Sequence, residues 1–185
     1  MSATASSTIG FLVILMIYAS VGVFAVIGSA VVTRKLLPPK GEQIFYAGFL
    51  MAIAAFYLAF AVYFGASPDA WQMESTAVIV FCGFALIGIR LPSALMLGYV
   101  LHGGWDLLHE LQAHGAASVF APGQSSDIPL AYGVFCATFD VGIAIYFYLR
   151  RAEWNAAWRR AAPASPATGA ALPLRFRSHR AVPVL

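Results

Sequence analysis

The stretch YVLHGGWDLLHE, residues 99–110, sets four ionisable side chains into an otherwise apolar segment. They are His102, Asp106, His109 and Glu110. An α-helix turns by about 100° per residue, so these side chains would fall within an arc of about 100° on one helix face. Imidazole and carboxylate groups gathered on one face can bind a divalent metal, transfer protons, or pair with groups on neighbouring helices.

Two further carboxylates are expected near the same place. His102 lies nine residues from Leu111, the expected outer end of its helix, at a depth of about 13 Å. Asp140 lies ten residues from Leu130, the outer end of the following hydrophobic segment, at a depth of about 15 Å. Glu74 falls in the outer turn of the preceding segment. If these three segments pack together, all six ionisable residues can line one pocket that opens to the outer face.

Ionisable side chains at such a depth are costly, which favours a function for them. A charged carboxylate at the bilayer centre costs about 2.5–3.5 kcal/mol on insertion scales. Such a group persists when it pairs, takes up a proton, binds a metal or contacts water, and ionisable residues inside a membrane are therefore candidates for function. The plainer alternative is that His102 and Asp140 form a structural hydrogen bond between two helices.

The composition points to a membrane setting for these residues. Hydrophobic residues make up 61% of the 185-residue chain and charged residues 10%, whereas soluble domains carry about 25% charged residues. A membrane helix needs about 20 apolar residues, and five such segments are present, over residues 9–32, 44–64, 71–89, 94–111 and 130–149. We therefore predict an all-α, polytopic integral membrane protein whose five transmembrane helices form one domain over residues 1–149. The two cysteines fall in apolar runs and indicate no disulfide framework.

The positive charges predict how these helices are oriented. All eleven lysine and arginine residues fall in the first loop, the third loop or the C-terminal tail. Cytoplasmic loops are enriched in these residues, so we expect the N-terminus outside and the C-terminus in the cytoplasm. Residues 150–185 are expected to form a basic, Ala- and Pro-rich cytoplasmic tail, largely disordered beyond a surface helix in its first turns. The net charge of +3 is then a topology signal, and we expect no nucleic-acid partner.

Two parts of the sequence resemble an uncharacterised family of small bacterial integral membrane proteins, a domain of unknown function. The family pattern is His-x-x-Trp-Asp-x-x-His-His in one span and Cys-x-x-x-Asp in the next. The residues that match it are His102, Trp105, Asp106, His109, Cys136 and Asp140. Glu110 departs from it, standing where the pattern has its last histidine. The resemblance covers about residues 74–149 and implies a multi-pass protein of the bacterial cytoplasmic (inner) membrane, without implying an activity.

The first of three functional hypotheses is a membrane enzyme. The expected metal ligands are His102, His109 and Glu110. Imidazole and carboxylate ligands suit Zn, Fe or Mn. The expected catalytic acid and base residues are Asp106, Asp140 and Glu74. A pocket walled by lipid-facing helices favours a lipid or isoprenoid-type substrate, so the expected partners are membrane lipid and a lipid-like small molecule.

Two other hypotheses stay open. A proton or metal-ion transporter would use the polar stripe as a relay, although the ionisable residues lie in the outer half and Arg90, at the inner end, would repel cations. An accessory subunit of a larger membrane complex fits the short loops and the small soluble mass, but it does not explain the polar stripe. A homo-oligomer is also open, because a channel through only five helices would need one.

Overall fold

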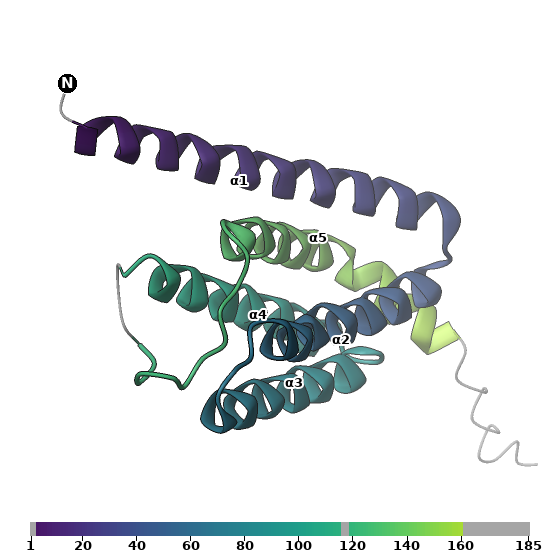
Figure 1. The fold of residues 1–185 in the computed structure, drawn as a ribbon. Helices are drawn as coiled ribbons and strands as arrows, with labels where there is room; N and C mark the ends of the chain where they lie inside the picture. Colours follow the sequence, from purple (N-terminus) through teal and green to yellow (C-terminus); the bar gives the residue numbers. More distant parts are fainter. Residues whose placement is uncertain (1–2, 116–118, 161–185) are drawn as a thin grey trace, which may run out of the picture.

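Five helices make up most of the part of the chain that the computed structural model describes, residues 3–115 and 119–160. In chain order they are α1 (Ala3–Leu36), α2 (Pro39–Tyr63), α3 (Pro68–Gly88), α4 (Pro92–Ala113) and α5 (Tyr132–Arg160). Figure 1 shows α1 lying along the outside of α5, with α2, α3 and α4 on the opposite side of α5. These described residues contain no β-strand, which confirms the predicted all-α fold.

Proline residues mark the start of three helices. Pro39, Pro68 and Pro92 occupy the first turn of α2, α3 and α4, where the fixed φ angle suits a helix and the missing N–H has no helical partner to lose. Ser67 caps α3, because its hydroxyl oxygen accepts a hydrogen bond from the Ala70 N–H at 3.1 Å. The longest loop between two helices joins α4 to α5 and covers residues 114–131.

Four helices are long and apolar enough to cross a membrane. They cover Thr8–Leu36, Pro39–Tyr63, Pro68–Gly88 and Tyr132–Arg160. Helix α4 has a similar length but a more polar composition, because its second half carries the ionisable residues of the YVLHGGWDLLHE stretch. Each of the five predicted segments corresponds to one helix. The length and composition of the four apolar helices are those of a membrane protein.

Helix α5 differs from the expectation at its C-terminal end. It runs unbroken past Leu149 to Arg160, so the first turns of the expected tail continue the last helix. The rest of that tail, residues 161–185, lies outside the described residues.

Helix α1 is attached to the rest of the structure mainly through α5. A Cβ atom at Gly22 would lie 2.8 Å from the Phe135 carbonyl oxygen, and one at Gly142 would lie 2.7 Å from Val26 Cγ2. Glycines of this kind let membrane helices approach closely. The large apolar side chains elsewhere on α1, such as Phe24, are mostly exposed, as expected for a helix that faces lipid.

One end of the bundle is held by Glu42, in the first turn of α2, whose side chain is completely buried. Its Oε2 atom accepts hydrogen bonds from Arg150 Nη2 and Trp154 Nε1, both at 2.8 Å. Its Oε1 atom accepts from the Tyr146 hydroxyl and, at 3.4 Å, from Thr33 Oγ1. These residues, here called the Glu42 cluster, tie α1, α2 and α5 together and leave both carboxylate oxygens partnered.

The sequence does not reveal the Glu42 cluster. The pattern places Glu42 in the expected first loop and Arg150 at the start of the expected tail. In the structure α2 begins earlier, at Pro39, and α5 continues through Arg150. Both residues are therefore helical and buried, and their charges pair inside the bundle.

We expect Arg150→Ala to lower the apparent melting temperature sharply, because it leaves the Glu42 carboxylate buried without its charge partner. Breaking a buried ion pair in this way costs about 3–5 kcal/mol. The matched control is Arg151→Ala at the next, exposed position, which should change little. Thermal denaturation in mild detergent, followed by circular dichroism, measures both variants, and equal melting temperatures would contradict this role of Arg150.

Candidate functional site

The candidate site lies where α4 packs against α5, the most extensive helix contact of the described chain. Gly103 makes the close packing possible, because a Cβ atom there would lie 3.1 Å from Asp140 Cβ and 3.3 Å from Ala137 Cα. With no side chain between the two helices at this point, the neighbouring side chains of α4 can reach Asp140 on α5.

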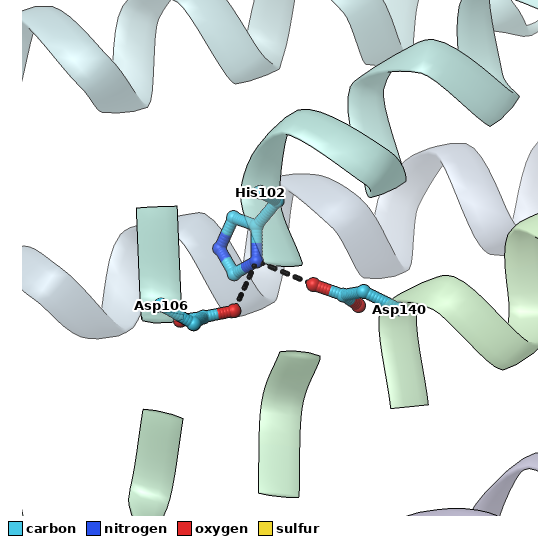
Figure 2. Close-up of side chains that lie close together, drawn as sticks. All are labelled: His102, Asp106 and Asp140. Atoms are coloured by element: carbon cyan, nitrogen blue, oxygen red, sulfur yellow. Dashed lines mark hydrogen bonds and ion pairs between the residues drawn. The ribbon is translucent and has the colours of Figure 1, made fainter. Parts of the chain in front are cut away.

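His102, Asp106 and Asp140 form a completely buried group, here called the His102 triad (Figure 2). His102 Nδ1 lies 2.7 Å from Asp140 Oδ2 and 3.0 Å from Asp106 Oδ2. Asp106 Oδ1 accepts a further hydrogen bond from the Tyr57 hydroxyl at 2.6 Å. The structure thus brings His102 and Asp140 together, as their matching depths suggest.

Three polar atoms of the His102 triad have no hydrogen-bond partner within the protein. They are His102 Nε2, Asp140 Oδ1 and Asp106 Oδ2, the last of which has only the ion-pair contact with His102 Nδ1. No other buried side-chain nitrogen or oxygen in the described part of the chain lacks one. Native proteins leave few buried polar atoms unpartnered, and each such atom points to an ion, a water or a chemical role.

The His102 triad keeps a net negative charge even when the imidazole is protonated and both carboxyl groups are ionised. One imidazolium ion can neutralise only one of the two carboxylates, and the other needs a second proton or a cation, since an unpaired buried charge is strongly unfavourable. A divalent cation, two carboxylates and a neutral imidazole would sum to zero. Within residues 3–115 and 119–160, this is the one group of His, Cys, Asp or Glu side chains with metal-ligand spacing, and its donor atoms lie within 4.8 Å of one another.

Glu74 and His109 form a second buried group, here called the Glu74–His109 pair. His109 Nε2 lies 2.9 Å from Glu74 Oε1. The same carboxylate accepts hydrogen bonds from the Ser126 backbone N–H at 3.0 Å, from the Ser126 hydroxyl at 3.1 Å and from Trp105 Nε1 at 3.3 Å. These contacts hold the Glu74 carboxylate between α3, α4 and the loop before α5.

The hydrogen bonds of His109 locate one proton of the Glu74–His109 pair. His109 Nδ1 lies 3.0 Å from the Trp105 carbonyl oxygen, which can only accept, so Nδ1 carries a proton. The 2.9 Å hydrogen bond between Nε2 and Glu74 Oε1 needs one further proton, which either of these two atoms can hold. The pair is neutral as a whole, and His109 holds a proton that it can donate.

Glu110 belongs to neither of these groups and contacts the first turn of α5 instead. Its Oε2 atom accepts a hydrogen bond from the Gly133 backbone N–H at 2.9 Å, and its Oε1 atom lies 2.8 Å from His114 Nε2. Gly133 stands in the first turn of α5, where free N–H groups and the helix dipole favour an anion. Glu110 therefore joins the end of α4 to the start of α5.

The six predicted residues thus fall into three groups. Of the expected metal ligands, the structure places only His102 in the group with metal-ligand spacing; His109 pairs with Glu74, and Glu110 caps α5. The companions of His102 are two of the expected acid and base residues, Asp106 and Asp140.

Tyr57 is a site residue that the sequence analysis missed. Besides its hydrogen bond to Asp106, its ring lies against the His109 ring, with the centroids 4.7 Å apart. Tyr57 therefore bridges the His102 triad and the Glu74–His109 pair. It sits in an apolar, aromatic run of α2, where nothing in the pattern distinguishes it from its neighbours.

A polar cavity of about 420 Å³ reaches His109 beside the loop between α4 and α5. Its polar lining residues are His109, Gln112, Ser125, Ser126 and Asp127, with Ser67 from the start of α3. His109 is the one member of the six predicted site residues that lines this cavity. The His102 triad lies deeper, out of contact with solvent.

A family of unknown function, DUF6010, matches residues 16–153. The chain belongs to this family. The DUF6010 match contains all six predicted site residues and reaches further than the resemblance over residues 74–149, since it also takes in α2 and most of α1. No curated protein and no solved structure matches the chain, so a function must be argued from the site itself.

We expect Gly133→Ala to destabilise the protein, because the added methyl group would meet the Asp106 carbonyl oxygen and lie 2.7 Å from Glu110 Cβ. Overpacking of this kind costs about 1–3 kcal/mol. Gly104→Ala on α4 is the matched control, since a Cβ atom there meets nothing within 4 Å and alanine is the better helix former. Apparent melting temperatures in detergent compare the two, and an equal effect of both substitutions would contradict the close α4–α5 contact.

Proposed function

We propose that this protein is a membrane enzyme that holds a divalent metal between His102, Asp106 and Asp140 and acts on a lipid or isoprenoid-type substrate. The observation that carries the proposal is the His102 triad, in which two buried carboxylates and an imidazole converge and three polar atoms stay unpartnered. A divalent cation would bring the net charge of the group to zero. One nitrogen and two oxygen ligands suit Zn, Fe or Mn.

A comparison of the His102 triad with the Glu42 cluster, another buried acidic group described above, supports the metal site. The buried carboxylate of the Glu42 cluster has a guanidinium partner, and hydrogen bonds from four side chains satisfy both oxygens. A buried acid that serves only stability is satisfied in this way. The His102 triad has more negative charge, fewer donors and unpartnered atoms, which is the pattern expected of a binding site.

The neighbouring residues have complementary roles in the proposal. A divalent metal supplies a Lewis acid and can activate a bound water. Tyr57 orients Asp106 through its hydroxyl. His109, protonated and held by Glu74, would act as the general acid, and the polar cavity at His109 would admit water.

The proposal includes α4 as a fifth span, in the orientation that the lysine and arginine residues favour, in the bacterial cytoplasmic membrane. The ionisable residues of α4 are all buried by its neighbours. Its exposed large side chains are apolar, namely Leu97, Val100, Leu101 and Leu107. A helix with this distribution can lie within a bilayer although its second half carries four ionisable residues.

A proton or metal-ion pathway is the second candidate, favoured by buried polar side chains between the triad and the Glu42 cluster. Tyr46 hydrogen-bonds Thr33 at 3.0 Å, and Thr33 reaches Glu42. The path is interrupted, however, at Tyr99, whose hydroxyl donates to the Tyr46 backbone carbonyl at 2.9 Å. It is also closed at Glu42, whose oxygens are already partnered. These interruptions favour the enzyme.

The proposal predicts about one equivalent of a transition metal per chain. The protein would be purified in mild detergent without a histidine tag, and bound metals would be quantified by mass spectrometry before and after incubation with Zn, Fe and Mn. His102→Ala and Asp140→Asn should each lose most of the metal, because each removes a ligand.

Glu110→Gln is the control for this experiment. The substitution keeps the shape of the side chain near the end of α4. Its amide oxygen can still accept from the Gly133 N–H at the start of α5, so the metal should stay. Circular dichroism and size-exclusion profiles confirm that each variant is folded. Absence of metal from the repleted protein, or equal metal in all variants, would refute the metal site.

A further inference from the structure

An apolar groove of about 640 Å³ runs between α3 and α4. Among its lining residues are Met73, Val80, Phe81, Leu101, Gly104 and Trp105. The polar groups at its edge are occupied, since the Thr76 hydroxyl donates to the Gln72 carbonyl and Trp105 Nε1 donates to Glu74. The groove therefore offers apolar contact and no hydrogen bond.

The inner wall of this groove touches the candidate site at two points. The Phe81 ring packs on the His102 ring, with centroids 4.9 Å apart. The Trp105 ring packs on the His109 ring, with centroids 5.1 Å apart. One layer of aromatic side chains thus separates the groove from both histidines of the site.

The groove and the polar cavity lie on the two sides of the second of these contacts. Trp105 lines the groove and His109 lines the polar cavity. Only the packed Trp105 and His109 rings separate an apolar environment from a polar one at this point, so a molecule with an apolar chain and a polar end would suit the pair. That combination of properties is the chemistry of a membrane lipid.

We infer that this groove binds one hydrocarbon chain of a membrane lipid, as the chain-binding part of the substrate site. The inference rests on the proposed function and adds the place where the chain of its substrate would bind. The volume lies within the range of about 300–1,000 Å³ that is usual for ligand sites, which are mostly apolar with a few polar groups near one end. Two of the lining residues, Val80 and Leu101, are themselves exposed on the apolar outer surface, so a chain can enter sideways from the bilayer.

The walls favour a chain over another helix. Contacts between membrane helices use a stripe of small residues that lets two backbones approach. Here bulky side chains, Phe81, Met73 and Trp105, form much of the lining. They leave a space between α3 and α4 that a flexible chain can fill.

Photolabelling tests the inference directly. The protein would be reconstituted in phosphatidylcholine vesicles that contain a small fraction of phosphatidylcholine with a diazirine on one acyl chain. After illumination, mass spectrometry of peptides locates the attached chains. We expect labelling of the groove to exceed, several-fold per residue, labelling of the exposed face of α1 around Met16 and Phe24, which only bulk lipid touches.

Two glycines provide matched variants. A Cβ atom at Gly104, which lines the groove, or at Gly48, exposed on α2 away from it, meets nothing within 4 Å. Gly104→Phe should fill the groove and lower its labelling several-fold, whereas Gly48→Phe should leave it unchanged. Equal labelling of groove and α1, or no effect of Gly104→Phe, would overturn the inference.

Measuring the bound metal in the same variants tests the proposed metal site independently of the lipid groove. Neither Gly104 nor Gly48 belongs to the His102 triad, so both variants should keep their metal. Metal without preferential labelling would refute the lipid groove and leave the metal site standing. Preferential labelling in a protein that binds no metal would do the reverse.

Discussion

The candidate site depends on the close approach of α4 and α5. Gly103 removes the side chain that would otherwise stand between them, and His102 and Asp106 then reach Asp140 with short side chains. The positions of the three groups are consequently set by two backbones rather than by long flexible side chains. Because the two helices bury the triad completely, each charge in it acts in a medium of low dielectric constant, where the state of one group strongly affects the others.

Aromatic rings pack against both histidines of the site. Phe81 covers His102, and Tyr57, Trp105 and Phe120 surround His109. These rings bring no charge of their own, so the charges of the site arise from five side chains, those of His102, Asp106, Asp140, Glu74 and His109. Tyr57 also contributes a hydroxyl to Asp106, which makes it both part of this wall and part of the polar network.

The sequence predicts those parts of the site that follow from single helices. The period of α4 places its ionisable residues on one face, and the rise per residue gives His102 and Asp140 the same depth. How the six residues divide depends on the rotation of α3 against α4 and on the loop residue Ser126, and neither can be read from one helix. The Glu42–Arg150 ion pair was hidden for a related reason, since it requires knowing that α2 begins early and α5 ends late.

Helix α5 is fastened at both ends, by Glu110 at Gly133 and by the Glu42 cluster at Arg150. Asp140 lies between these two attachments, so it has little freedom to slide or tilt relative to α4. In the proposed metal site, fixed helix positions of this kind would fix the distances between the ligands and so favour cations of one size. Mg²⁺ and the first-row transition metals bind at about 2.0–2.2 Å, whereas Ca²⁺ needs 2.3–2.6 Å and more oxygen ligands. Selectivity among cations would then be determined by contacts at the two ends of the helix, remote from the ion itself.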